Sequence, residues 1–320
     1  MRISVLTINE FEIIEKYFTR PKKRSDVILS VGDDCALLNV PQGQLLAVSI
    51  DTLNENIHFL PEMPAHALGY KALAVNLSDL AAMGATPAWA TMALTLPDVN
   101  ESWLSDFSEG FFSLASAFQV DLVGGNLSRG PRSITIQVHG FIPPDQAITR
   151  STAKAGDLIF VSGHLGGAAA ALSVHQKNRS LSSEHKKSLA QAWYYPSPQI
   201  ALGKKLTGLA SSAIDLSDGL LGDLSHILKQ SQVGAEIFID KIPQHPLLST
   251  LFPQHEARHF ALSGGEDFEL CFTVPRNKLY QLPSDMPLTC IGKITEEKNL
   301  KLLDAQGELY LTHELGFTHF

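Results

Sequence analysis

The sequence predicts an α/β protein of the α+β type with two domains, and three observations favour this fold class. The chain has 320 residues, which is longer than most single domains. Hydrophobic residues make up 44% and charged residues 18%, values of a folded globular chain rather than a disordered one. Helical and strand periodicities alternate along both halves, and a small polar stretch separates them at residues 152–156. We therefore expect domains over residues 1–150 and 151–320.

The first domain begins with a helix over residues 7–18. Thr7 and Glu10 have the spacing of a capping box, and the apolar residues that follow repeat at helical spacing. The elements expected after it are strands over 28–31 and 45–50, a helix over 64–83, a strand over 88–96, a helix over 103–118, and strands over 120–123 and 134–141. In the last strand Ile134, Ile136 and Val138 alternate with polar residues, which predicts one wetter face.

The second domain repeats this mixture of elements. A polar stretch over 175–188 interrupts it. The elements expected are a strand over 158–161, a helix after Gly166-Gly167, a helix over 198–209, a strand over 213–216, a helix over 220–228, and strands over 268–274 and 289–294.

Charge and cysteine content exclude several classes of protein. The chain carries 25 basic and 33 acidic residues, a net charge of −8, and one basic run at residues 20–24, so we expect neither nucleic-acid nor membrane binding. Three widely spaced cysteines indicate neither a disulfide framework nor a zinc site. No apolar run approaches the length of a membrane span, and the N-terminus lacks a signal-peptide core. We expect a cytoplasmic protein.

Acidic residues stand where predicted strands end. Asp33-Asp34 follows the first strand, Asp51 ends the second, and Asp215 and Asp218 lie between a strand and a helix. Ligands of α/β folds bind in crevices at such strand ends. Taken singly, each acid could equally be a turn residue.

Asp79 occupies an apolar position of the long predicted helix. Leu68, Ala72, Val75 and Asp79 fall at i, i+4, i+7 and i+11, on one stripe. A buried carboxylate without a partner is costly, so Asp79 needs a cation, an arginine partner, a capping role or an edge position half in water.

The acids as a set favour magnesium and a polyphosphate ligand. Scattered carboxylates with few histidines suit a hard ion, and Mg²⁺ completes its shell with water and phosphate oxygens. The glycine pairs at 124–125, 166–167 and 264–265 could approach phosphate or form ordinary turns. No P-loop, protein-kinase or dinucleotide fingerprint is present.

Six blocks in register resemble the thiamine-monophosphate kinases, from about residue 8 to the terminal Gly-Phe-Thr-His-Phe. The blocks are Gly32-Asp-Asp-Cys-Ala36, Asp51-Thr with His58-Phe59, Asn76-Leu-Ser-Asp-Leu-Ala-Ala-Met-Gly-Ala85, Arg150-Ser151, Ile214-Asp-Leu-Ser-Asp-Gly219 and Ser263-Gly-Gly-Glu-Asp-Phe-Glu269.

This resemblance implies a fold of the aminoimidazole-ribonucleotide-synthetase type and a homodimer built through strands of the N-terminal domain. It implies Mg²⁺-dependent transfer of the ATP γ-phosphoryl group to thiamine monophosphate, with residues 1–150 binding ATP and magnesium and residues 151–320 completing the active site. Carried over by motif, the magnesium ligands are Asp34, Ser49, Asp51, Asp79, Asp215 and Asp218, with Asn126 as a weak ligand. Contacts to ATP fall to Gly125, Asn126, Arg150 and Ser217, and contacts to the thiamine substrate to His58, Glu266 and Phe317. No protein nucleophile is expected.

Two positions depart from the family pattern. Asn126 stands where Asp is usual after Gly-Gly, and Ile50 stands where Thr is usual before Asp51, so we expect one metal to bind more weakly. Two alternatives stay open. One is another enzyme of the same superfamily, such as an aminoimidazole-ribonucleotide synthetase. The other is a nucleotide-binding protein that has lost catalysis.

Overall fold

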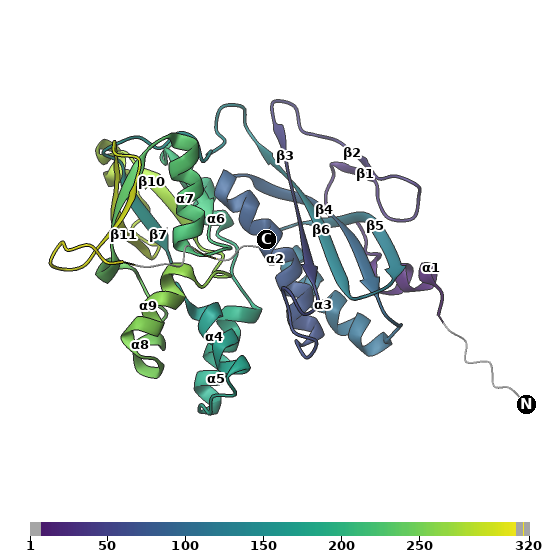
Figure 1. Ribbon diagram of the computed structural model, residues 1–320. Helices are drawn as coiled ribbons and strands as arrows, with labels where there is room; N and C mark the ends of the chain where they lie inside the picture. The colour runs from purple at the N-terminus through teal and green to yellow at the C-terminus, as the bar shows by residue number, and fades with distance from the viewer. Residues whose placement is uncertain (1–7, 312–315, 317–320) are drawn as a thin grey trace, which may run out of the picture. The chain divides into compact units, whose positions relative to one another are not determined.

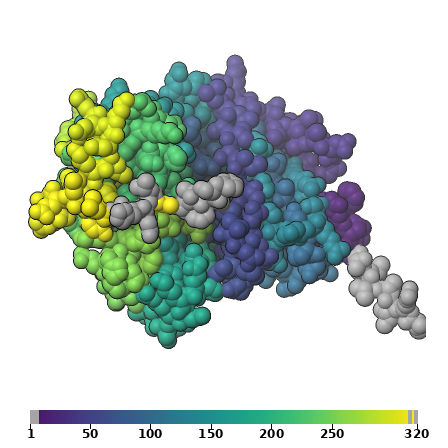
Figure 2. All heavy atoms as spheres, in the orientation of Figure 1, coloured from purple at the N-terminus to yellow at the C-terminus, as the bar shows by residue number. Residues whose placement is uncertain are grey.

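The structure is a computed structural model that describes residues 8–311 and residue 316. Its described residues form two compact units (Figure 1). The first unit takes the residues up to Asn76 and Pro87–Phe141, and the second takes Leu77–Thr86 and the residues from Ile142 onward. Helix α2 (Ala65–Met83) therefore supplies its first part to one unit and its last part to the other. Figure 2 shows the same view with all heavy atoms, in which side chains fill the space between the ribbons within each unit.

A four-stranded sheet organises the first unit, in the order β3 (Leu45–Asn54), β6 (Ser133–Ile142), β4 (Thr86–Leu96), β5 (Asp121–Arg129). Strands β4 and β5 run parallel. A separate two-stranded sheet, formed by β1 (Val27–Leu29) and β2 (Leu37–Leu38), precedes β3 in the sequence. Along β6 the apolar residues are buried and the alternating polar residues are half-buried, which confirms the predicted wetter face.

The first helix begins at a different cap from the predicted one. Thr7 lies outside the described residues, and α1 (Glu10–Ile13) is capped by Asn9, whose side chain accepts from the Glu12 amide. The Glu12 carboxylate accepts from the Asn9 amide in return, which completes a capping box. The chain then continues as one π-helical turn over Ile14–Phe18.

Helix α2 is buried on nearly every side, not along one stripe. Leu68, Ala72 and Val75 are buried as predicted, but most other residues of the helix are buried too. Helix α3 (Glu101–Ala117) approaches α2 backbone to backbone. A Cβ on Gly69 would lie 2.0 Å from the Phe107 carbonyl oxygen, and one on Gly110 would lie 1.9 Å from that of His66. Only glycine permits this crossing.

The second unit is built on a six-stranded sheet whose strands run antiparallel except for the first pair. The order is β12 (Leu300–Leu303), β9 (Gly234–Phe238), β11 (Leu288–Thr295), β7 (Leu158–Ser162), β10 (Leu270–Val274), β8 (Ser212–Asp215). Strand β10 begins two residues later than predicted, because Glu266 and Phe268 adopt left-handed backbone angles.

The helices of the second unit are α4 (Gly167–Gln176), α5 (Ser183–Tyr194), α6 (Ile200–Leu206), α7 (Leu220–Ser231), α8 (Leu248–Leu251) and α9 (Gln254–Ser263). The polar stretch at 175–188 is helical at its end, where Ser182 caps α5 by accepting from the His185 amide. Leu221, Leu224 and Ile227 of α7 share one buried core with the β7 residues Ile159 and Val161. Among the described residues, no helix combines the length and apolarity that crossing a membrane requires.

Candidate active site

Three predicted site residues of the first unit line one cavity. Asp34, Gly125 and Asn126 border a space of about 720 Å³, within the size range of small-ligand sites. Its apolar wall includes Phe11, Ile14, Phe18, Met92 and Leu94. The cavity is therefore lined by apolar side chains together with acidic and amide side chains.

Gly125 is required where strand β5 passes β4. It pairs with Met92, and a Cβ there would lie 1.9 Å from the Met92 carbonyl oxygen. A larger residue would separate the two strands, so the glycine keeps the backbone at the cavity edge. Strand β5 continues through Asn126, which leaves the Asn126 side chain exposed.

Asp51 lies within strand β3 rather than at its end, because β3 continues to Asn54. Its backbone amide donates to Oδ1 of Asn76 at 3.0 Å, and the Asn76 side-chain amide donates to the Ala72 carbonyl. Asn76 is 1% exposed, so a buried side chain of α2 fixes the position of Asp51. Ser49 and Asp51 share one face of β3, and Ile50 points to the other.

His58 has a structural function that the sequence did not indicate. Its Nδ1 accepts a hydrogen bond from the Asn54 amide at 3.0 Å, and its own amide donates to the Asn54 carbonyl at 2.9 Å. The imidazole thus closes the turn that follows β3.

Asp215 is the most electrostatically unusual residue of the second unit. It ends strand β8 and is 4% exposed. Burial raises the pKa of its carboxyl well above the ordinary value, and the charges of Asp79 and Asp223 raise it further. The Ser78 hydroxyl and the Arg150 guanidinium act in the opposite direction but do not cancel the rise.

The structure therefore brings Asp79 and Asp215, two of the expected magnesium ligands, close enough for their charges to interact. Asp79 is half-buried, which agrees with the alternative that its side chain lies at an edge of the helix packing, half in water. A buried carboxyl beside further acids holds its proton more strongly than an ordinary one, and a cation could take the place of that proton. Magnesium, which prefers carboxylate oxygens, fits this donor set.

The described residues contain no preformed group of three or more metal-ligating side chains.

Asp223 is a site residue that the sequence analysis missed. It stands in the first turn of α7, 2% exposed, and accepts hydrogen bonds from the backbone amides of Asp218 and Gly219, both at 3.1 Å. Burial and the Asp218 charge raise the pKa of Asp223 to about 7. Asp223 therefore shapes the loop that carries Ser217 and Asp218. Its apolar neighbours at helical spacing gave no signal of this function.

The turn over residues 264–269 is fastened to the same loop. The Glu266 amide donates to the Ser217 carbonyl and the Phe268 amide to the Leu216 carbonyl, both at 2.8 Å. Glu266 and Phe268 have φ of +61° and +51°, a conformation that costs energy for residues other than glycine. The turn thus places Glu266 beside the loop of Ser217 and Asp218.

Two further acids anchor this turn. The Asp267 carboxylate accepts from the Gly166 amide at 2.8 Å, next to the start of α4, and the Ser162 hydroxyl donates to Glu269. Burial raises the pKa of Asp267 to about 8 and that of Glu269 to about 7. Both acids thus hold the turn in place through hydrogen bonds to segments before α4.

Arg150 also belongs to this region of the second unit. Its carbonyl accepts from the Ser231 hydroxyl at 2.8 Å, which fixes its backbone beside α7, and its charge reaches Asp215. Phe317 lies outside the described residues.

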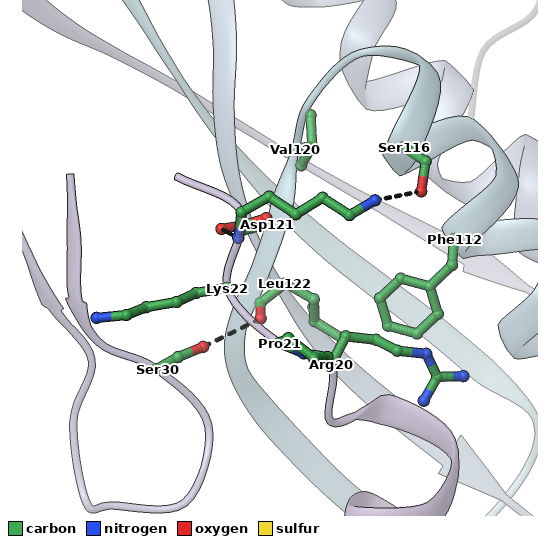
Figure 3. Close-up of a pocket in the computed structure, with 10 residues that line it drawn as sticks. Arg20, Pro21, Lys22, Ser30, Phe112, Ser116, Val120, Asp121 and Leu122 are labelled. Atoms are coloured by element: carbon green, nitrogen blue, oxygen red, sulfur yellow. Dashed lines mark hydrogen bonds between the residues drawn. The ribbon is translucent and has the colours of Figure 1, made fainter. Parts of the chain in front are cut away.

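The basic run at residues 20–24 lines a separate cavity of about 250 Å³ (Figure 3). Its cations already bind acceptors of the protein. The Lys22 ammonium donates to the Val27 and Ile28 carbonyls, the Lys23 ammonium donates to the Ser116 hydroxyl, and the Arg20 guanidinium lies 4.6 Å from the Phe112 ring centre. The run therefore stabilises the first unit, and none of the predicted site residues lines this cavity.

Comparison with known proteins gives one consistent result. The family model of the AIR synthase related protein, N-terminal domain, matches residues 32–142, and that of the C-terminal domain matches residues 154–304. The chain is 47% identical to "Thiamine-monophosphate kinase" of Escherichia coli strain K12, over 98% of this chain and 99% of that protein.

Solved structures agree. The crystal structure of thiamine-monophosphate kinase from Stenotrophomonas maltophilia K279a matches with a TM-score of 0.84 and 42% identity, over 90% of this chain and 93% of that chain. A structure described as AaThiL complexed with AMPPCP and TMP matches with a TM-score of 0.79 and 29% identity, over 88% and 89% of the two chains.

Proposed function

The chain belongs to the thiamine-monophosphate kinase family, and from this premise we propose how its residues transfer the γ-phosphoryl group of ATP to thiamine monophosphate. The product is thiamine diphosphate. Full-length similarity to a thiamine-monophosphate kinase at 47% identity is the observation that carries this function. The geometry of the two units supports the assignment of individual residues.

The first unit is proposed to bind ATP at the cavity bordered by Asp34, Gly125 and Asn126. The close approach of β4 and β5 at Gly125 leaves backbone amides at the cavity edge, where phosphate oxygens can reach them. The apolar wall suits a flat purine ring. Arg150 and Ser217 of the second unit are proposed as further contacts to ATP.

Magnesium is proposed as the cation that these acids require. The ligands assigned by the family pattern are Asp34, Ser49, Asp51, Asp79, Asp215 and Asp218, with Asn126 as a weak ligand. Crowding of Asp79, Asp215 and Asp223 supports this assignment, because it raises the pKa of Asp215 and a bound cation would relieve the repulsion among these acids. Bound magnesium would neutralise phosphate charge and hold the nucleotide in register with its acceptor.

The protein needs no catalytic base for this transfer. A phosphate monoester is already ionised at neutral pH, so the acceptor oxygen of thiamine monophosphate is a ready nucleophile. The tasks left to the protein are to bind both substrates in line and to exclude water. His58 accordingly is proposed to bind the substrate and not to abstract a proton, in agreement with the use of its Nδ1 as an acceptor for a backbone amide.

Glu266 and Phe317 are proposed to hold the thiamine part of the substrate. The Glu266 carboxylate can accept from the aminopyrimidine or face the cationic thiazolium ring. Its placement on a strained, fastened turn supports this function, because such strain is found where a side chain must point in one direction.

A cytoplasmic homodimer is proposed as the functional form. Strand β3 lies at the end of its sheet, and Leu46, Val48 and Ile50 on one of its faces are 43, 50 and 57% exposed. An edge strand with an apolar face favours pairing with another copy of the chain. Light scattering should give twice the chain mass, and Val48→Lys should give a monomer. A monomeric wild type would contradict the proposal.

A product assay with purified protein tests the reaction. ATP, Mg²⁺ and thiamine monophosphate should yield thiamine diphosphate, whereas thiamine and formylglycinamidine ribonucleotide should yield no product. Turnover of the purine precursor would reassign the chain to the synthetase alternative. ATP binding without turnover of any of the three would indicate lost catalysis.

A further inference from the structure

Trp193 donates a hydrogen bond to the proposed substrate-binding carboxylate. Its indole Nε1 lies 3.0 Å from Oε2 of Glu266. Trp193 stands at the end of α5, 73 residues before Glu266 in the chain, and is 3% exposed. Nothing in the sequence around either residue indicates that the two side chains interact.

The side chain of Glu266 needs such a partner. Its backbone is fixed, since its amide donates to the Ser217 carbonyl and a Cβ on Gly265 would lie 2.7 Å from that same oxygen. Beyond Cα, however, a glutamate rotates about three bonds, and a fixed backbone does not choose among the rotamers. The indole N–H selects the rotamer that points the carboxylate toward α5.

Trp193 is itself held in one orientation. Its ring lies 4.9 Å from the ring centre of Tyr194 and 6.3 Å from that of His175 on α4. Because the indole is buried among these rings, it loses its conformational freedom when the protein folds, before the substrate binds. The donor is therefore preorganised when Glu266 meets its ligand.

We propose that Trp193 is a positioning residue for substrate recognition: it orients the Glu266 carboxylate toward the amino group or cationic ring of the substrate. This inference rests on the assignment of Glu266 to the thiamine substrate in the proposed function. Without the indole N–H, Glu266 would occupy several rotamers and substrate binding would weaken, while binding of ATP would be unchanged.

A purely structural function of Trp193 makes a different prediction, and two substitutions separate them. Trp193→Phe keeps more of the buried ring but removes the donor. Trp193→His keeps a donor, because the five-membered rings of indole and imidazole superpose with Nε2 where Nε1 was, but it leaves a larger cavity. Stability should therefore fall in the order wild type, Phe, His. Substrate binding should weaken in the order wild type, His, Phe.

The first unit contains a matched control. Nε1 of Trp89 donates to Oδ1 of Asp26 at 2.9 Å, and Trp89 is 1% exposed. Trp89→Phe thus removes the same type of hydrogen bond at similar burial, from a carboxylate other than Glu266. It should lower stability and leave the KM for thiamine monophosphate unchanged.

Steady-state kinetics of the full-length enzyme and its variants test the inference. In Trp193→Phe the KM for thiamine monophosphate should rise about tenfold, with the KM for ATP unchanged and kcat within about threefold. In Trp193→His the KM for thiamine monophosphate should lie much closer to the wild-type value. Combining Trp193→Phe with Glu266→Gln should give the KM of Glu266→Gln alone, because the indole acts only through that carboxylate.

The opposite outcomes overturn the inference. The inference is wrong if the KM for thiamine monophosphate rises more in Trp193→His than in Trp193→Phe, as the loss of stability does. It is also wrong if the effects of Trp193→Phe and Glu266→Gln on this KM add in the double variant, or if Trp89→Phe changes this KM as much as Trp193→Phe does. A measurement on wild-type protein does not depend on variant folding: the indole N–H resonance of Trp193 should shift when thiamine monophosphate joins the complex with an ATP analogue. An unshifted Trp193 resonance would contradict the proposal. Failure of the proposed function would show separately, as absence of thiamine diphosphate with wild-type enzyme.

Discussion

The two units treat a shielded carboxylate in opposite ways. In the first unit Asp26 accepts from Arg24 at 2.6 and 2.9 Å and from the Trp89 indole at 2.9 Å. Burial alone would raise the pKa of Asp26, but these hydrogen bonds hold it below its ordinary value. In the second unit burial raises the pKa of Asp215, and nearby acids raise it further.

This difference separates an acid that stabilises the fold from acids that we propose to bind a ligand. The charge of Asp26 is neutralised within the protein, so Asp26 contributes to the free energy of unfolding. The Asp215 carboxyl is buried beside other acids, which lowers the stability of the fold. A strongly raised pKa caused by crowded carboxylates is typical of functional sites.

Asp215→Asn should have the largest effect on activity. It removes a proposed magnesium ligand, so kcat should fall on the order of 100-fold or more. Because it also removes a buried acid from among other acids, the free energy of unfolding without magnesium should stay within about 1 kcal/mol of wild type. Steady-state kinetics measure kcat, and denaturant unfolding measures the free energy of unfolding. A variant with near-normal kcat would contradict the metal assignment, and Asp79→Asn should behave as Asp215→Asn does.

Asp26→Asn should show the reverse pattern. It leaves Arg24, whose side chain is 19% exposed, without its carboxylate. The free energy of unfolding should therefore fall by roughly 2–4 kcal/mol, while kcat of the folded fraction should be unchanged. If kcat falls instead and stability does not, the contrast between the units is wrong.

The pH dependence of stability should come from the second unit. Asp223, Asp267 and Glu269 have pKa values raised to about 7, 8 and 7. Between pH 4 and these values the unfolded chain loses protons that the folded chain retains, so stability without magnesium should fall as pH rises. Each acid contributes a slope of at most about 1.4 kcal/mol per pH unit.

Urea unfolding between pH 5 and 8 measures this slope. Glu269→Gln should make it shallower, and Asp26→Asn should leave it unchanged because the pKa of Asp26 lies below the range. A stability that rises steadily from pH 5 to 8 would contradict the raised pKa values.

Asn126→Asp should have the smallest effect. It restores a charge at the cavity of the first unit, so the magnesium concentration for half-maximal activity should fall about threefold to tenfold. Asn100→Asp adds the same charge in the same unit, at the cap of α3, where an acid is tolerated. An identical magnesium response in both variants would remove Asn126 from the metal site.

The sequence predicted the features that depend on local pattern. Helix α2, the alternation along β6 and the loop of Asp215 and Asp218 all follow from spacing and turn chemistry over a few residues. The cap at Asn9 was missed because two capping patterns overlap at residues 7–12, and only packing decides between them.

The missed site residues depend on contacts that hydrophobic periodicity does not reveal. The spacing of its apolar neighbours predicts only that Asp223 is a polar residue of an amphipathic helix. Its hydrogen bonds to the preceding loop depend on the residue at which α7 begins. Trp193 meets Glu266 across 73 residues. The left-handed angles of Glu266 and Phe268 were equally invisible, because neither residue type favours them.

Thermal unfolding with magnesium and a non-hydrolysable ATP analogue tests most directly whether the acids of the second unit await a cation. Magnesium should raise the melting temperature of the wild type and of Asp26→Asn, by a few degrees at saturating concentration. It should not raise that of Asp215→Asn. An equal rise in all three proteins would show that magnesium binds elsewhere and that the charge of Asp215 has another partner.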